Sequence, residues 1–360
     1  MTSVLAFFAP AALDLLILFL HVVVPARWTV GYVLGDAGAP LRYRLNGLSV
    51  FVITIGLYVG CCHEGWLDPT AFYDHRWAMV TGACVVGLLF TFALVFTAPP
   101  VPGASVLANL YLGRRENPQW GGGRVDGKMY LYLAGAVGLE LNLLSFAAHH
   151  FRVHPDDPSP GVVLYTALFT FFVAEYLFFE KVHLYTYDFV AERVGFKLGW
   201  GCLVFYPFFY GVGLWSTADL PNPHLAAWQL ALSALLFFSG WVLARGANLQ
   251  KYLFKTRPSA RLFGLLEPTA IEGDGHRLLC GGFWRVSRHV NYLGELGMAL
   301  GLTLSLGHPT SPWPWLYPLY YVGLLFPRQA ADDRRCAEKY GALWQEYCRR
   351  VPYRIIPFVY

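Results

Sequence analysis

The sequence has 360 residues, of which 56% are hydrophobic and only 14% are charged. A soluble globular domain carries about 25% charged residues, and the mean hydropathy of this chain is +0.42. These values exclude an ordinary soluble protein and predict a polytopic membrane protein.

Nine apolar runs follow one another along the chain, and a helix of about 20 apolar residues crosses a bilayer. Several runs are shorter or are interrupted by Gly and Pro, so we expect about nine to ten transmembrane helices. Such an arrangement predicts an all-α bundle of membrane helices. The runs cover residues 4–24, 48–62, 78–97, 129–147, 162–179, 198–215, 225–244, 293–306 and 313–326.

The loops between these runs differ in charge. Lys and Arg gather in residues 114–128, 181–197 and 245–288 and in the C-terminal tail, whereas the loops at 64–74 and 149–157 are neutral or acidic. The positive-inside rule therefore predicts a cytosolic C-terminal region and an N-terminus on the opposite side. The first run has no basic segment before it and no cleavage site, which predicts a retained helix rather than a signal peptide.

The cysteines and glycines show no established binding motif. The seven cysteines lack the spacing of a zinc site, so we expect free thiols and no metal. The segment GGRVDGK imitates a phosphate loop, but Met129 stands where that motif needs a hydroxyl, and residues 121–123 are better explained as a turn. No G-x-G-x-x-G follows a strand, which excludes a Rossmann dinucleotide site.

A basic segment begins at Arg245 and continues the last long apolar run before it. Asn248, Lys251 and Lys255 are spaced by three and four residues, so a helix places them on one face. Two ammonium groups one turn apart suit a phosphate, in particular the 2′-phosphate of a nicotinamide dinucleotide. The alternative is a positive anchor at the end of a membrane helix.

Two further segments combine aromatic and polar groups. The sequence WRVSRHVNY, which ends at Tyr292, could stack on a ligand ring and bind phosphate, or it could be an aromatic belt at the membrane surface. In the tail, Tyr340, Trp344 and Tyr347 are spaced to form one helix face. That face could cover a cofactor or lie on the membrane.

These three segments together resemble the C-terminal signature of the sterol reductase family. That family includes the sterol C-14 reductases, the 7-dehydrocholesterol reductases and the membrane domain of the lamin B receptor. The matching motifs are RGANLQKYLFK, GFWRVSRHVNYLGE and DDRRCAEKYGALWQEY followed by VPYRIIP, in the family's order and spacing. The resemblance is strong from Arg245 onwards and weaker back to Val173, and residues 1–110 are too generic to match.

The resemblance implies NADPH-dependent reduction of a ring carbon–carbon double bond in a sterol, within a pocket of membrane helices. It divides the chain into N-terminal helices, residues 1–160, and a reductase core, residues 161–360. The motifs favour C-14 slightly over C-7. The dinucleotide contacts that the resemblance implies are Lys251, Lys255, Leu279, Trp284, Asn291, Tyr292, Asp332, Cys336, Ala337, Glu338, Lys339, Tyr340 and Tyr347.

Reduction of an isolated alkene requires a proton donor, because protonation should precede hydride delivery. A tyrosine common in the family aligns with Phe178, which has no proton, so we predict Glu180 and Asp332 as the catalytic acids. Other family positions are also altered, to Gln119, Tyr132 and Ala134. These differences fall on the sterol side rather than the cofactor side.

Two alternatives stay open from the residues. The R-H-x-x-Y pattern also resembles membrane methyltransferases that use S-adenosylmethionine to modify isoprenylcysteine or phospholipids. A sterol-binding protein without catalytic activity is the other alternative, given the altered sterol side. The expected partners are a sterol, NADPH and the lipid bilayer of the endoplasmic reticulum or of a bacterial inner membrane, and no nucleic acid is expected.

Overall fold

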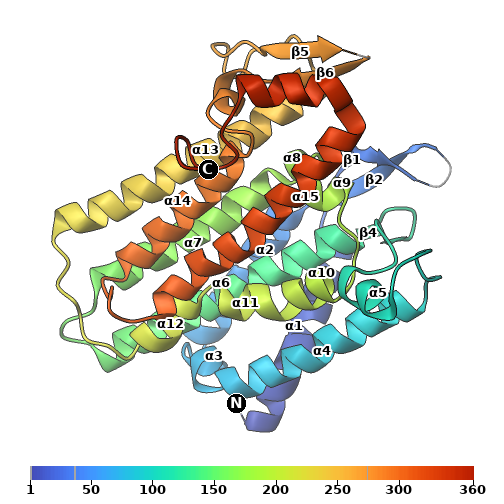
Figure 1. Cartoon of the computed structure of the whole chain (residues 1–360). Helices are drawn as coiled ribbons and strands as arrows, with labels where there is room; N and C mark the ends of the chain where they lie inside the picture. The colour runs from blue at the N-terminus through green and yellow to red at the C-terminus, as the bar shows by residue number, and fades with distance from the viewer. Residues whose placement is uncertain (1, 36–37, 274) are drawn as a thin grey trace. The chain divides into compact units, whose positions relative to one another are not determined.

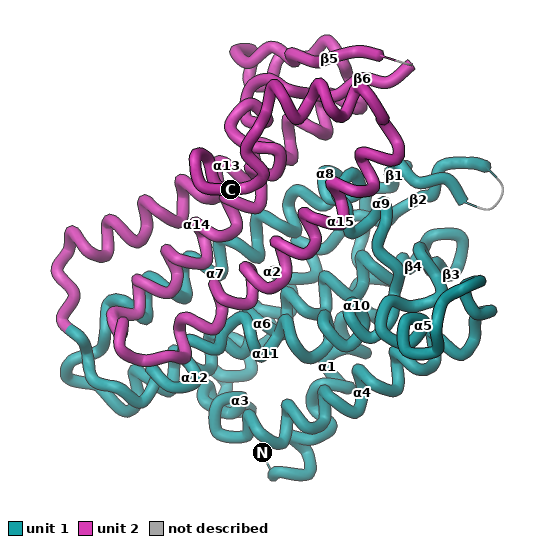
Figure 2. Tube along the Cα trace, in the orientation of Figure 1, with its two compact units in different colours: residues 1–223 teal, residues 224–360 magenta. Residues whose placement is uncertain are grey.

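The computed structural model describes residues 2–35, 38–273 and 275–360. The chain forms two compact units, residues 1–223 and residues 224–360 (Figure 2). The division expected from the family resemblance, between residues 160 and 161, concerns function rather than compactness and stays a prediction.

The N-terminal unit is built on long apolar helices (Figure 1). It also contains two small antiparallel hairpins, β1 with β2 and β3 with β4. The long helices are α1 (Ser3–Val23), α2 (Gly47–His63), α4 (Arg76–Phe96), α6 (Gly127–Val153) and α7 (Pro160–Phe178). The shorter elements are β1 (Arg27–Leu34), β2 (Pro40–Leu45), α3 (Ala71–Asp74), α5 (Val106–Leu112), β3 (Gln119–Trp120), β4 (Val125–Asp126), α8 (Glu180–His183) and α9 (Tyr187–Val190).

The last helical segment of this unit, Phe196–Thr217, is interrupted by a π-helical turn at Gly201–Phe205. Its α-helical parts are α10 (Phe196–Trp200), α11 (Tyr206–Phe209) and α12 (Val212–Thr217). Pro207 stands just after the π turn, where its ring cannot continue a regular helical hydrogen-bond pattern. The interruption agrees with an apolar run, residues 198–215, that contains four Gly and one Pro.

Helix α6 forms the centre of the N-terminal unit. In its most apolar window 83% of the residues are buried, compared with 22% in α1. Asp126 caps the start of the helix, and its carboxylate accepts hydrogen bonds from the backbone nitrogens of Lys128 (3.1 Å) and Met129 (3.0 Å). Lys128 is fully buried, and its Nζ donates to the backbone oxygen of Asp188 (2.8 Å). The lysine of GGRVDGK is therefore a structural anchor rather than part of a phosphate loop.

The C-terminal unit contains three long helices and one hairpin. These are α13 (Ala227–Thr256), α14 (Val290–Ser305), α15 (Trp313–Arg350), and the strands β5 (Ala270–Gly273) and β6 (His276–Leu279). Helices α13 and α14 approach closely through glycines. A Cβ atom at Gly294 would collide with the backbone oxygen of Gly240, and one at Gly301 would lie 2.7 Å from that of Ser233. Small residues at a helix contact are typical of membrane proteins.

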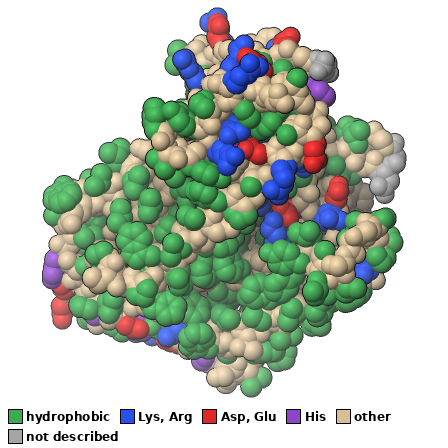
Figure 3. Space-filling view, viewed as in Figure 1, with side chains coloured by type: hydrophobic (Ala, Val, Ile, Leu, Met, Phe, Trp, Pro, Cys, Tyr) green, Lys and Arg blue, Asp and Glu red, His purple; other side chains and the backbone are tan. Residues whose placement is uncertain are grey.

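Each of the nine predicted apolar runs lies largely in helix, so the prediction of a mostly helical membrane protein is confirmed. Within the described residues, six helical segments are long and apolar enough to cross a membrane. The runs at 48–62, 293–306 and 313–326 form α2, α14 and the start of α15, which do not meet that length or hydropathy. Hydrophobic side chains cover much of the surface in view (Figure 3), as expected for contact with lipid.

Candidate functional site

The C-terminal end of α13 carries the two lysines predicted to bind phosphate. Lys251 and Lys255 are four residues apart and therefore lie on one face of the helix. Lys255 is within electrostatic range of Lys251 and also of Lys339 and Asp332 from α15. Three lysine side chains and one carboxylate thus gather within the C-terminal unit. This excess of positive charge suits an anionic ligand such as a phosphate.

The Trp284 ring faces the ammonium group of Lys251. The Nζ of Lys251 lies 5.5 Å from the centroid of the Trp284 ring, and the indole Nε1 donates to the backbone oxygen of Ala247 at 3.0 Å. Trp284 and Leu279 are each only 9% exposed and pack with Ala247 and Val290. The resemblance placed both residues among the dinucleotide contacts, but only their exposed edges can touch a ligand.

Gln250 fixes the turn that carries Trp284, a role that the sequence analysis missed. This side chain is 3% exposed, and its Nε2 donates to the backbone oxygen of Gly281 at 3.2 Å. Its Oε1 accepts a hydrogen bond from the backbone nitrogen of Phe283 at 3.0 Å. Gly282 between them has φ +63°, which favours glycine. The motif R-G-A-N-x-Q-K thus contains a structural glutamine beside its cationic lysine.

Asp333 is the centre of an ion-pair network that the sequence analysis also missed. Its carboxylate lies 3.2 Å from Nη1 of Arg288, 3.5 Å from Nε2 of His289 and 3.8 Å from Nε of Arg354. The backbone nitrogens of Arg288 and His289 donate to the backbone oxygens of Tyr353 and Arg354, both at 2.9 Å. This network joins α15, the segment before α14 and the end of the chain. In the sequence, only the adjacent Asp332 and Asp333 and the dipeptide Arg288-His289 indicate this network.

Asp332 and the residues after it form the part of α15 that the resemblance assigns to the cofactor. Cys336 lies one helical turn beyond Asp332, and burial raises the pKa of its thiol to about 12. Ala337, Glu338 and Lys339 are exposed on the following turn. The thiol therefore stays protonated at neutral pH, and the exposed turn is accessible to a ligand.

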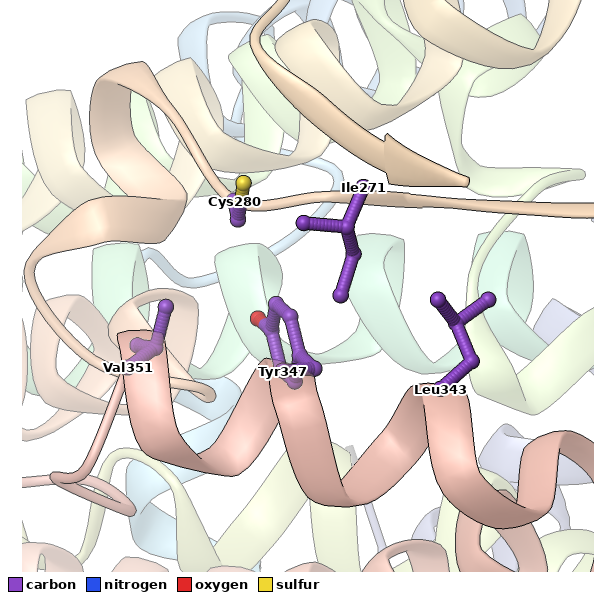
Figure 4. Close-up of a cluster of buried hydrophobic side chains, with 5 residues drawn as sticks. All are labelled: Ile271, Cys280, Leu343, Tyr347 and Val351. Atoms are coloured by element: carbon purple, nitrogen blue, oxygen red, sulfur yellow. The ribbon is translucent and has the colours of Figure 1, made fainter. Parts of the chain in front are cut away.

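The continuous helix face that the spacing predicted for the aromatic residues of the tail is interrupted by a kink, although Tyr340 and Trp344 both pack against the cluster that contains Tyr347. Gly341 has φ 51° and ψ −121°, so α15 is interrupted between Tyr340 and Trp344. Beyond this kink, Tyr347 is 4% exposed and packs against Ile271 and its neighbours. The cluster of buried side chains, drawn in Figure 4, consists of Ile271, Cys280, Leu343, Tyr347 and Val351. Tyr347 therefore joins the tail to the β5–β6 hairpin.

Asn291 and Tyr292 lie in the first turn of α14. Within the part of the chain that the structure describes, the buried Oδ1 of Asn291 has no hydrogen-bond partner. The ring of Tyr292 stacks on that of His289, with centroids 5.0 Å apart. A buried amide oxygen without a partner is costly unless a ligand or solvent satisfies it. Asn291 is thus the residue of this segment whose environment points most clearly to a bound group.

Glu180 lies in the N-terminal unit. Its Oε1 accepts a hydrogen bond from the backbone nitrogen of Gly47 at 3.1 Å, and the residue is 7% exposed. Burial raises the pKa of this carboxyl to about 8, although the Gly47 hydrogen bond acts in the opposite direction. A cavity of about 10 Å³ lies beside it, large enough for about one water molecule. The cavity is lined by Met129, Tyr132, Tyr176, Leu177, Glu180, His183 and Phe189.

Two phenols share this cavity with Glu180. Tyr132 occupies one of the altered family positions, and Tyr176 stacks on His183 with ring centroids 3.9 Å apart. Phe178, by contrast, is 67% exposed. Phe178 thus lacks the hydroxyl group of the family's tyrosine, but Tyr132 and Tyr176 line the cavity next to the Glu180 carboxyl. The two predicted acids belong to different compact units, Glu180 to residues 1–223 and Asp332 to residues 224–360.

Comparison with known proteins extends the match beyond the C-terminal motifs. A family model described as the ergosterol biosynthesis ERG4/ERG24 family matches residues 12–360. The chain is 33% identical to a Delta(14)-sterol reductase of Arabidopsis thaliana, over 94% of this chain and 91% of that protein. It is 31% identical to a Delta(14)-sterol reductase of Methylotuvimicrobium alcaliphilum, over 95% and 80% of the two chains. For a Delta(14)-sterol reductase of Mus musculus the identity is 36%, over 89% and 77%.

These matches include the N-terminal helices, which the motifs alone left unassigned. Each of the three relatives is at least 30% identical, and this chain covers more than two thirds of each. The protein therefore belongs to the ERG4/ERG24 family of sterol reductases.

Proposed function

We propose that this protein reduces a ring carbon–carbon double bond of a sterol within the membrane and takes the electrons from NADPH. The observation that carries the cofactor assignment is the cluster of Lys251, Lys255 and Lys339 in the C-terminal unit. Its relatives are named Delta(14)-sterol reductases, which favours the C-14 double bond over C-7.

The residues of the C-terminal unit fit a phosphate-bearing dinucleotide. Lys251 and Lys255 would hold the 2′-phosphate, because paired cations on one helix face bind a phosphate strongly. Trp284 fixes the position of Lys251, and the unpartnered Oδ1 of Asn291 could accept a hydrogen bond from an amide of the ligand. When bound, NADPH supplies a hydride.

Glu180 is the proposed donor of the proton that adds to the sterol double bond, and Asp332 is the second proposed acid. With a pKa of about 8, Glu180 retains its proton at neutral pH and can donate it. The cavity beside it would hold a water that connects the carboxyl to Tyr132 or Tyr176. Asp332 lies close to Lys255 and would act at the cofactor end of the reaction.

The cytosolic position of the C-terminal unit is part of the same proposal, because NADPH must reach Lys251 from the aqueous phase. The membrane would be the endoplasmic reticulum or a bacterial inner membrane. Membership of the reductase family makes an S-adenosylmethionine-dependent methyltransferase the weaker alternative. If the protein only bound sterols without reducing them, it would retain its affinity for NADPH but yield no reduced sterol.

Product analysis tests the proposal directly. The full chain, purified in detergent, is incubated with NADPH and either a sterol with a C-14 double bond or one with a C-7 double bond, and the products are measured by mass spectrometry. We expect a gain of two hydrogens in the C-14 substrate. Reduction of the C-7 substrate alone would overturn the bond assignment, and no reduction of either sterol would overturn the activity. Methylation of an isoprenylcysteine substrate with S-adenosylmethionine serves as the test of the alternative.

A further inference from the structure

The β1–β2 hairpin connects two apolar helices at one end of α1. Helix α1 ends at Val23, the hairpin begins at Arg27, and α2 begins at Gly47. The 21 residues of α1 are long and apolar enough to cross a membrane. At 1.5 Å per residue, a helix of this length spans about 30 Å, which is the thickness of the hydrocarbon core. The hairpin therefore starts at the level of the membrane surface.

The inner face of this hairpin belongs to the core of the N-terminal unit. Tyr43 is 1% exposed and packs with Met129, Leu184 and Phe189. Gly31, on the neighbouring strand, leaves room for this ring, because a Cβ atom there would collide with it. Met129 and Phe189 also line the cavity of Glu180. The inner face thus connects the hairpin to the wall of that cavity.

The outer face of the hairpin is apolar and basic. Successive residues of a strand point to opposite faces, and four large side chains of β1 are exposed. The register with β2 shifts between Val30 and Leu34, and the half-exposed ring of Tyr32 also contacts Tyr185, with centroids 5.8 Å apart. Arg42 stands opposite Val30 in the register, and its guanidinium lies 5.0 Å from the centroid of the Trp28 ring. Arg27 alternates with Trp28 and so belongs to the other face of β1, but at the start of the strand its side chain is exposed. The exposed apolar residues are Trp28 (44%), Val30 (55%), Tyr32 (45%) and Leu34 (60%).

We propose that this outer face rests on the anionic lipid headgroups of the bilayer that α1 crosses. Trp28 and Tyr32 are residue types that prefer the membrane interface, where one end of the ring is apolar and the other is wet. Arg42 on this face and the exposed Arg27 at the edge of the hairpin add positive charge that attracts anionic headgroups. Val30 and Leu34 contribute apolar area that water would otherwise contact.

Continuity with the membrane favours lipid over a protein partner. The chain leaves one apolar helix four residues before the hairpin and enters another two residues after it. The hairpin has no freedom to move far from the bilayer surface, so its apolar face is held next to lipid without the cost of bringing two molecules together. This inference is independent of the sterol reaction proposed above.

Photo-crosslinking in lipid nanodiscs tests the proposal on the full chain. The photoreactive residue benzoylphenylalanine replaces Val30 in one variant. A matched control carries it at Glu272, an exposed position on the β5–β6 hairpin, where the exposed side chains are polar. The nanodiscs contain equal amounts of phosphatidylglycerol and phosphatidylcholine. We expect severalfold more lipid adduct from position 30 than from position 272, with phosphatidylglycerol in excess.

The arginines are tested in the same assay. The double variant Arg27→Gln and Arg42→Gln, combined with the probe at position 30, should give both lipids in the equal ratio of the nanodisc. An unchanged thermal unfolding midpoint shows that this variant is folded. Lipid adducts no more abundant than those of the Glu272 control would overturn the proposal, and so would a crosslinked dimer as the main product. A phosphatidylglycerol excess that survives in the double variant would overturn the role of the arginines.

Discussion

At the scale of single residues, Glu180 shows how burial selects a protonation state. The pKa of its carboxyl is raised from 4.5 to about 8, mainly by burial. Between pH 4.5 and about pH 8, the Glu180 carboxyl is ionised in the unfolded chain but keeps its proton in the folded chain. The stabilising contribution is therefore fully present below pH 4.5 and is lost as the pH rises through 8.

Glu180→Gln should remove this pH dependence. The neutral amide cannot ionise, so the thermal unfolding midpoint should fall less between pH 5 and pH 8 than in the wild type, over the interval set by the raised pKa. Turnover should drop strongly while NADPH affinity stays nearly unchanged. The exposed Glu116→Gln is the matched control. A Glu180→Gln variant with the turnover and pH profile of the wild type would exclude this carboxyl as the proton donor.

Lys251 is the residue whose removal most directly tests cofactor selection. Lys251→Ala should weaken NADPH binding by about 1.5–3 kcal/mol, the range for a hydrogen bond to a charged group. NADH lacks the 2′-phosphate, so its weaker binding should change little. Titration calorimetry with both nucleotides measures the difference, and Lys181→Ala, an exposed lysine of the N-terminal unit, is the control. Equal affinity of the wild type for NADPH and NADH would contradict the assignment.

At the scale of elements, α15 places two adjacent carboxylates in different roles. Asp333 pairs with Arg288, His289 and Arg354, whereas Asp332 lies near Lys255. Removing one partner of a largely buried ion pair leaves the other charge uncompensated, at a cost of about 3–5 kcal/mol. The two positions therefore form a natural matched pair for mutation.

Asp333→Asn should loosen the end of the chain. The amides of Arg288 and His289, which bond to Tyr353 and Arg354, should exchange with deuterium about tenfold faster or more. Asp332→Asn should leave this exchange unchanged but lose most turnover. Hydrogen exchange read by mass spectrometry, together with sterol product analysis, separates the two effects. Equal exchange in both variants would show that Asp333 does not hold the tail.

The elements also show what local sequence patterns can and cannot predict. Periodicity placed Lys251 and Lys255 on one face of α13, because helix geometry depends only on spacing. The same reasoning failed at Gly341, since one glycine with positive φ ends the period between Tyr340 and Trp344. The partners of Gln250 and Asp333 lie more than 30 residues away along the chain, except for Arg354. Contacts at such separations depend on tertiary packing and leave no local signal.

At the scale of the whole molecule, composition and hydropathy were sufficient for the class of fold. Long apolar runs must become helices in a bilayer, because lipid offers no partner for backbone hydrogen bonds. The three small hairpins were not predicted, since residues 27–45, 119–126 and 270–279 read as basic or polar loops. Each hairpin is short and gains its stability from packing on the helices rather than from its own sequence.

The orientation of the whole chain in the membrane decides whether Lys251 can meet cytosolic NADPH. Native Cys336 is a poor reporter of orientation, because burial raises its pKa to about 12 and leaves little reactive thiolate. Exposed reporters are better, so we choose Glu338→Cys in the tail and Asp156→Cys in the loop predicted to face the opposite side. In sealed vesicles of known orientation, a membrane-impermeant maleimide added to the non-cytosolic side should label Asp156→Cys above the wild-type background. It should reach Glu338→Cys only after detergent is added. Labelling of Glu338→Cys in intact vesicles would reverse the topology and separate the lysine cluster from the cytosolic pool of NADPH.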